Sequence, residues 1–341
     1  MTKAFLYSFL LMFLHSAPSQ QPDMEHTPFQ IGAVNYFGYA GIDLAPIRAQ
    51  LPLHPGDTLT FARFTKNPTE AVVTRLTGHP PTDVNITCCD EARHLLIYVG
   101  LAGTSSRPML FSISPRGSAQ LEPVALQLYD QDMAALERAV ASGNAGEDDS
   151  QGYALSNDPA RRQINLSMRA YARAREADFI RVLRHASDPR QRRVASTFLG
   201  YVPRSATQVK ALAQAVTDPD DEVRNNAVRA LSVLSAARNT GPLLIDPQPF
   251  IALLFSGKWT DRNKGSMFLA RLTERRDPAL LTALREQALQ PLIEGASWSG
   301  DPGHTGAFLV ILGRIAGLPD DKLQQLMDRR DSAAIIEAAK R

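Results

Sequence analysis

Histidines, cysteines and paired carboxylates are the side chains of this sequence that could do chemistry. Six of the seven histidines lie beyond the first 20 residues, and their spacing is not that of metal ligands. They are His26, His54, His79, His94, His185 and His304. A hydrolase would need imidazoles and carboxylates to meet in a deep pocket, and His54, His79 and His94 are the candidates for such a site.

The paired carboxylates fall where solvent, rather than a cleft, is expected. Asp148-Asp149 lies in an acidic, glycine-rich stretch, and Asp220-Asp221 lies in the predicted first turn of a helix. The sequence also lacks a Gly-x-Ser-x-Gly elbow, a Gly-x-Gly-x2-Gly loop and a Walker-type phosphate loop. We therefore predict no catalytic, cofactor-binding or metal-binding residue, and a protein that is not an enzyme. A hydrolase with an unrecognised site is the third hypothesis.

The only cysteines, Cys88 and Cys89, are adjacent. Neighbouring residues of a strand point to opposite faces, and a disulfide between them closes a strained eight-membered ring. We therefore expect two thiols, both buried or one of them exposed. A redox or metal role would require more ligands than the neighbouring residues supply.

The first residues have the composition of an export signal. Lys3 supplies a positive start, Ala4 to Leu14 is apolar except for Ser8, and Ala17-Pro18-Ser19 offers the small residues that signal peptidase needs. The apolar run is short for a bilayer span, and no other segment is long and apolar enough. We predict a signal peptide over residues 1–19, cleaved after Ser19, and a periplasmic or secreted mature protein. An uncleaved N-terminal anchor is the alternative.

Charge is distributed unevenly along the 341 residues. Residues 1–154 carry 9 basic and 15 acidic side chains, whereas residues 155–341 carry 28 basic and 20 acidic ones, 23 of the 28 being arginine. Solvated helix faces rich in arginine explain this excess. The alternatives are docking of the two halves on each other, or an anionic partner for the second half. Export disfavours nucleic acid as that partner.

Residues 28–130 predict a small α+β domain. β-forming residues mark a strand from Phe29 to Gly41, and Asp43 can cap a short helix over Leu44–Leu51. Thr69–Leu76 has features of both a helix and a strand. A hairpin follows, with strands Val84–Cys88 and Leu95–Val99.

This order of strand, helix, strand and strand resembles a polypeptide-transport-associated domain, a module that handles exported chains in outer-membrane assembly. The residues that carry the likeness are Val34, Phe37-Gly38, Asp43, Ile47, Leu53, Gly56-Asp57 and Ile97-Tyr98-Val99. Domains of this family usually have two helices between the first and second strands. The resemblance implies a role in envelope protein assembly or export, with this domain as the working part.

Residues 131–157 predict a helix followed by a domain linker. Met133, Leu136 and Val140 have helical spacing, and the stretch from Gly143 to Gly152 is small, acidic and glycine-rich. An extended piece, Pro108–Ile113, precedes this helix.

Residues 158–341 predict helix after helix, and one pattern recurs. A basic residue is followed by a small residue three positions on, a core residue after six, a leucine after seven and a core residue after ten. The pattern occupies Arg192, Ala195, Phe198, Leu199 and Val202, then Arg224, Ala227, Ala230, Leu231 and Leu234, then Arg262, Gly265, Phe268, Leu269 and Leu272. Helix start signals precede it at Asp188-Pro189, Asp218-Pro219 and Thr260-Asp261.

A period of about 30 to 40 residues made of helix pairs is typical of an α-solenoid. The pattern Asp-Pro-x3-Val-Arg-x2-Ala-x2-Ala-Leu, which begins at Asp218, resembles a HEAT repeat, the close relative of the armadillo repeat. The resemblance implies that Asp218 and Arg224 hydrogen-bond within and between repeats. A row of ligand-binding arginines, Arg192, Arg224 and Arg262, is the alternative.

We therefore expect a multidomain protein with a small α+β domain and an all-α, HEAT-like solenoid of about five helix pairs. The structural repeat positions are Asp188, Arg192, Ala195, Asp218, Arg224, Ala227, Leu231, Arg262, Gly265 and Leu269. The predicted function is non-enzymatic binding of a protein or peptide on the surface lined by the second helix of each pair. The alternative is an accessory factor in envelope protein assembly or export. The sequence identifies neither the partner, nor the residues that bind it, nor the oligomeric state.

Overall fold

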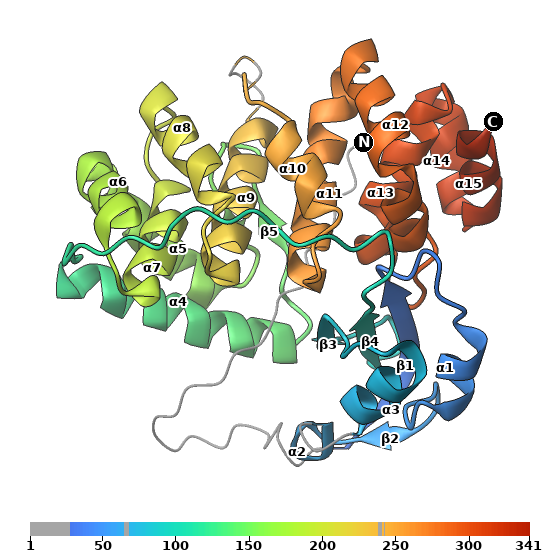
Figure 1. Cartoon of the computed structure of the whole chain (residues 1–341). Helices are drawn as coiled ribbons and strands as arrows, with labels where there is room; N and C mark the ends of the chain where they lie inside the picture. Colours follow the sequence, from blue (N-terminus) through green and yellow to red (C-terminus); the bar gives the residue numbers. More distant parts are fainter. Residues whose placement is uncertain (1–27, 65–67, 238–240, 242) are drawn as a thin grey trace. The chain divides into compact units, whose positions relative to one another are not determined.

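The structure is a computed structural model that describes residues 28–64, 68–237, 241 and 243–341. The predicted signal peptide over residues 1–19 lies outside the described residues. The described chain begins with a small α/β region that contains a four-stranded sheet, and the remainder is mostly helical (Figure 1). The coarse prediction of an α+β region followed by helices is confirmed.

The elements follow the sequence pattern closely. The first region contains β1 (Phe29–Phe37), α1 (Ala45–Gln50), β2 (Thr58–Leu59), α2 (Phe61–Phe64), α3 (Thr69–Thr77), β3 (Asp83–Cys88) and β4 (Leu95–Gly100). The segment that had features of both a helix and a strand is thus the helix α3. A long helix, α4 (Pro123–Ala141), and a two-stranded ribbon of β5 (Glu147–Asp148) and β6 (Leu155–Ser156) come next.

Helices make up the rest of the described chain. They are α5 (Pro159–Ala172), α6 (Glu176–His185), α7 (Pro189–Leu199), α8 (Ala206–Ala215), α9 (Asp221–Ala236), α10 (Gln248–Leu253), α11 (Trp259–Leu272), α12 (Pro278–Ala296), α13 (Pro302–Ile315), α14 (Asp320–Asp328) and α15 (Ser332–Lys340). None of the helices within the described ranges combines the length and the apolar character needed to cross a membrane.

The sheet has the strand order β2-β1-β4-β3. β1 runs parallel to β4, with Val34 opposite Ile97, and β3 runs antiparallel to β4. All six residues of β4 are buried, which explains why its run from Leu95 to Val99 is apolar without alternation. Ile47 of α1 and Val73 of α3 share one core with Ile97 on one face of the sheet.

The opposite face of the sheet is covered by aromatic side chains from the C-terminal half of the chain. The ring of Tyr98 lies 4.8 Å from that of Trp259 and 5.0 Å from that of Trp298, centroid to centroid. The indole nitrogen of Trp298 donates a hydrogen bond to the carbonyl of Tyr36 at 3.0 Å. The sheet is therefore packed on both faces.

Two expectations from the sequence are wrong. Cys88 and Cys89 form a disulfide, although we expected two thiols. β3 ends at Cys88, so Cys89 already belongs to the turn and strand alternation no longer separates the two side chains. The second concerns Asp218, which does not cap its helix: α9 begins at Asp221, and Asp220 is the cap.

The predicted linker is ordered and partly buried. α4 begins eight residues before the predicted helix, at Pro123, because the proline is at the first turn and the apolar spacing extends back to Ala125. Glu147 and Asp148 pair with Leu155 and Ser156 in the two-stranded ribbon. Composition indicated a solvated linker here, but the Glu147 side chain is only 4% exposed.

The described chain forms two compact units. The first, which we call the helical unit, contains Leu110–Phe250 and Met267–Glu274. The second, the sheet-containing unit, holds the described residues up to Met109 together with Ile251–Ser266 and Arg275–Arg341. The division predicted at residues 131–157 follows composition, whereas the units follow packing, and the predicted domain boundaries stay a prediction.

Candidate functional site

The arginines of the recurring pattern make the same contact in three places. Each guanidinium donates a hydrogen bond to the backbone carbonyl six residues earlier, in the turn that precedes its own helix. The bonds join Arg192 to Ala186 at 3.0 Å, Arg224 to Asp218 at 2.8 Å and Arg262 to Ser256 at 2.7 Å. An arginine at this position therefore holds the turn before its helix closed.

Asp218 joins two successive copies of the pattern. Its carboxylate accepts hydrogen bonds at 2.9 and 3.0 Å from Nε and Nη2 of Arg192, and also accepts one from the backbone of Asp220. Both side chains are nearly inaccessible to solvent. A bidentate pair of this kind is rigid, so it fixes α9 against α7.

The remaining repeat positions are packing or capping positions. Ala195, Ala227, Leu231, Gly265 and Leu269 are buried. Asp188 caps α7 by accepting a hydrogen bond from the backbone of Arg190 at 2.8 Å. The structure thus places the predicted set in helix contacts and turns.

A buried ionic network in the helical unit was not predicted. Arg161 donates to both oxygens of Asp132, at 2.9 and 3.1 Å, and to Glu147 at 2.8 Å. Arg229 also pairs with Glu147, and Asn165 donates to Asp132 at 2.6 Å. Burial would raise the pKa of the Glu147 carboxyl, but Arg229 and Arg161 hold it below its usual value. The acidic composition around Glu147 indicated solvent, which is why the sequence did not reveal this network.

A second buried pair, Arg262 with Glu294, lies in the sheet-containing unit at 3.3 Å. Glu294 accepts hydrogen bonds from the backbone of Gly38 at 2.7 Å and from the hydroxyl of Ser105 at 2.5 Å. Gly38 has φ of 70°, and a Cβ there would collide with the carbonyl of Leu101, so only glycine fits. One carboxylate thereby ties α12 to both central strands of the sheet.

His304 also lies in the sheet-containing unit, where its ring packs against that of Tyr98 on β4. The Tyr98 hydroxyl and His304 Nδ1 are 2.5 Å apart, and the His304 ring is 1% exposed. Burial, together with Lys264, lowers the pKa of His304 to about 4, although Asp301 acts in the opposite direction. Burial and Asp301 raise the pKa of Tyr98 well above its usual value. Both groups are therefore neutral at physiological pH.

The histidines that a hydrolase would use are not brought together. His54 lies 3.4 Å from Asp57 and His94 lies 3.1 Å from Asp90, each within its own turn. Within the described ranges no hydrogen bond or ion pair joins His54, His79 or His94 to another of the three. The same residues include no group of three or more His, Cys, Asp or Glu side chains placed to hold a metal ion.

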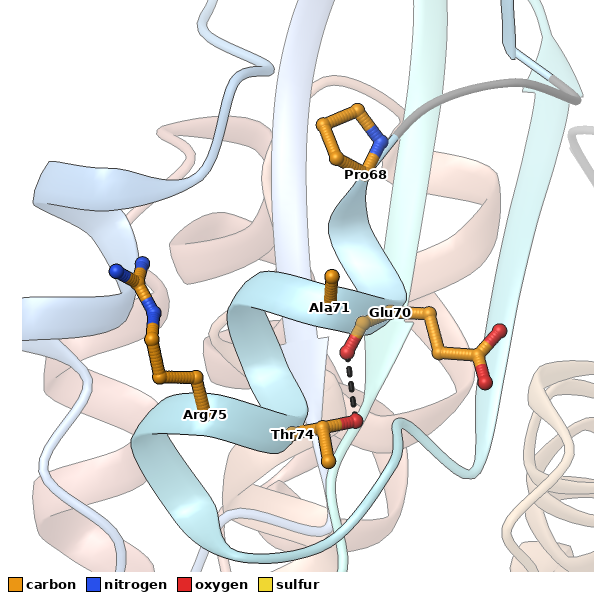
Figure 2. A pocket seen from close by; sticks show the side chains of 5 residues that line it. All are labelled: Pro68, Glu70, Ala71, Thr74 and Arg75. Atoms are coloured by element: carbon orange, nitrogen blue, oxygen red, sulfur yellow. Dashed lines mark hydrogen bonds between the residues drawn. The ribbon is translucent and has the colours of Figure 1, made fainter.

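Figure 2 shows a hollow on the outer side of α3, lined by Pro68, Glu70, Ala71, Thr74 and Arg75. All five residues are exposed. The hydroxyl of Thr74 donates to the backbone carbonyl of Glu70 at 2.7 Å, and Arg75 donates to Gln50 at 2.9 Å. The residues of this hollow face open solvent, so it lacks the enclosed, convergent groups of a catalytic site.

The feature that sets the helical unit apart is an extended segment, Leu110–Leu121, which we call the strap. The sequence predicted its first part as extended. The backbone of Ser112 donates to the carbonyl of Thr217, before α9, at 2.7 Å. The carbonyl of Gly117 accepts from the backbone of Ser187, before α7, at 2.8 Å.

The two contacts of the strap are at the turns before α7 and α9, but not at matching residues. Ser187 follows the residue whose carbonyl Arg192 holds, and Thr217 precedes the residue whose carbonyl Arg224 holds. Five residues of the strap separate the two contacts, and the trace crosses α9 and then α7 in Figure 1. Leu110 and Ile113 are 90% and 87% exposed along it. An extended chain held by its backbone at successive turns makes the strap the candidate interaction site.

Comparison of the chain with models of protein families and with curated proteins finds no match in either. The functional assignment accordingly rests on the geometry described above.

Proposed function

We propose that this chain is an exported, non-enzymatic binding protein whose helical repeats recognise an extended polypeptide. The observation that carries the proposal is the recurrence of one contact: Arg192, Arg224 and Arg262 each hold the turn six residues before them. Equivalent turns at a regular spacing are what a HEAT-like solenoid would offer to an extended chain, because each repeat presents the same surface again. The leader over residues 1–19 supports export.

The strap supports a polypeptide as the ligand. It belongs to the same chain, yet it is held through backbone groups at the turns before α7 and α9, with the side chains of Leu110 and Ile113 in solvent. Recognition through backbone groups depends little on side-chain identity and suits extended segments of varied sequence. The second helices, α6 and α8, would line the opposite, concave surface of such a solenoid.

Site-directed photocross-linking in the full-length chain tests the proposal. A photoreactive phenylalanine would replace the exposed Arg184 on α6 or Lys210 on α8, with Gln163 and Ser167 on the first helix α5 as matched exposed controls. We expect discrete cross-linked products from α6 and α8 and none from α5. Equal labelling from both sets, or no discrete product from any position, would show that the second helices bind no polypeptide.

A second candidate function is that of an accessory factor in envelope protein assembly or export. The observation that favours it is α3, which supplies the second helix between β1 and the β3–β4 hairpin that polypeptide-transport-associated domains have. β2 and α2 are additions to that pattern. Deletion of the gene should then lower the amount of folded outer-membrane proteins, and unchanged amounts would exclude this function.

A further inference from the structure

Around Ser112 the strap has one backbone edge against the helices and one edge toward solvent. Ser112 uses both its amide and its hydroxyl on the carbonyl of Thr217. In an extended chain the N–H and C=O groups of adjacent residues point to opposite edges, so those of Phe111 and Ile113 point away from the helices. The alternation does not continue to Gly117, whose carbonyl also faces the helices. Within the described residues the backbone groups of Phe111 and Ile113 make no hydrogen bond, so the outer edge of the strap is open at these two residues.

The charge on the strap itself is of one sign: it contains no carboxylate, and its one charged side chain, Arg116, is exposed. The guanidinium of Arg224, which lies 4.5 Å from the centre of the Phe111 ring, is buried. Arg181 donates to the carbonyl of Gln120 at 3.4 Å and also pairs with Asp178 at 3.7 Å. A segment that lies along the strap would meet apolar side chains and positive charge, so a neutral or acidic segment fits and a basic one does not.

Exposed apolar side chains beside arginine could also meet an anionic membrane, but the open backbone edge argues against it. Each N–H or C=O group buried in lipid without a partner costs several kcal/mol, so an extended segment with an unpaired edge is disfavoured there. A second extended chain removes that cost, because it supplies a partner for each of these groups.

We propose that the outer edge of the strap binds an extended, neutral or acidic segment of a partner protein by strand addition. The inference rests on the proposed function, names the partner class and adds the strap as a second place of contact beside α6 and α8. Leu110 and Ile113 supply apolar contacts to the added strand, the backbone of Phe111 and Ile113 supplies its hydrogen bonds, and Arg116 meets an acidic residue at its end.

A fluorescent Glu-Val-Thr-Val-Thr-Val-Glu peptide, blocked at both termini, is the probe for the full-length protein. Two further forms of it carry N-methyl groups on the threonines or on the valines, which removes the N–H donors of one strand edge without changing the side chains. Strand addition predicts that one methylated form binds like the parent and the other loses at least about tenfold in affinity. Equal affinities for the two methylated forms would overturn the proposal.

Protein variants locate the contact. Ile113→Asp should weaken binding of the parent peptide at least about tenfold by placing a charge on the apolar edge. Leu244→Asp, at a site that is 92% exposed outside the strap in the same unit, is the matched control and should leave binding unchanged. Arg116→Glu should weaken binding of the parent and strengthen binding of a probe with lysine in place of glutamate.

The outcomes separate this proposal from the proposed function. If the probe binds and Ile113→Asp and Leu244→Asp behave alike, strand addition at the strap is wrong, while binding at α6 and α8 stands on its own cross-linking result. If phosphatidylglycerol vesicles sediment the protein in an Ile113-dependent way and no peptide binds, the strap is a membrane contact and the proposal is overturned.

Discussion

Arg161 in the helical unit and Arg262 in the sheet-containing unit are both buried, with 3% and 1% of their side chains exposed. Their pKa values are nevertheless shifted in opposite directions. Burial lowers the pKa of Arg161, but Asp132 and Glu147 outweigh it and raise that pKa above its usual value. Burial lowers the pKa of Arg262 to about 10, and Glu294 offsets only part of the effect. The balance between burial and nearby carboxylates thus differs in sign between the two arginines.

The two networks also differ in redundancy. Glu147 lies between Arg161 and Arg229, so it keeps a counter-charge when Arg161 is lost, while Asp132 keeps the neutral donor Asn165. Glu294 keeps only the neutral donors Gly38, Ser105 and Gln290 when Arg262 is lost. The comparison indicates that the sheet-containing unit depends more heavily on a single residue.

Arg262→Met should therefore produce the largest loss of stability, about 3–5 kcal/mol, because it leaves the Glu294 carboxylate buried without a counter-charge. Urea unfolding followed by tryptophan fluorescence measures it, since both tryptophans, Trp259 and Trp298, lie in this unit. Adding Glu294→Gln to this variant should restore part of the loss. If the stability losses of the two single variants add up to the loss of the double variant, Arg262 and Glu294 are not coupled. The inferred dependence of this unit on Arg262 is then wrong.

Arg161→Met should cost less, about 2–3 kcal/mol, because Arg229 remains as a counter-charge for Glu147. The loss should be visible by far-UV circular dichroism, which reports helices, while the tryptophan transition should move less than in Arg262→Met. A larger loss for Arg161→Met than for Arg262→Met would reverse the inferred order of dependence.

Acid should weaken the sheet-containing unit through His304. The folded protein binds a proton on His304 only near pH 4, whereas the unfolded chain binds it near its ordinary value of about 6.5. The unfolded state therefore binds more protons between these values, and the free energy of unfolding falls as pH falls through this window, by up to about 3 kcal/mol.

Urea unfolding at several pH values between about 4.5 and 7 measures this effect. His304→Gln should flatten the pH dependence, because glutamine does not titrate there. An unchanged slope in that variant would assign the acid sensitivity to other groups. Glu147 contributes below this window, because its lowered pKa keeps it ionised until the pH is more acidic than for an ordinary glutamate.

Local features of the fold could be predicted from the sequence, since they depend on local patterns. The caps at Asp158 and Asp188, the helix spacing and the β3–β4 hairpin follow from neighbouring residues. The expectation for Cys89 was wrong because strand alternation was applied beyond the predicted strand end at Cys88. Asp218 departed from expectation because its carboxylate forms a bidentate pair with Arg192, a contact that local propensity does not contain.

The candidate site was only partly predictable for the same reason. Pro108–Ile113 reads as extended, but its backbone partner Thr217 is about a hundred residues away, and no spacing rule links the two. That both faces of the sheet are covered could be inferred in part from the sequence. The unbroken apolar run of β4 indicates a strand buried on both faces, and Tyr98 within it requires a polar partner, which His304 supplies.

The smallest expected effect concerns an ion pair that lacks burial. Arg330 and Glu91 approach to 3.1 Å in the sheet-containing unit, but their side chains are 72% and 73% exposed. Water and salt screen such a pair, so Glu91→Ala should change the free energy of unfolding by less than about 0.5 kcal/mol, and a double-mutant cycle with Arg330→Ala should give a coupling near zero. A coupling as large as that of Arg262 with Glu294 would mean that burial does not set the strength of these pairs, and the contrast between Arg161 and Arg262 would then need another cause.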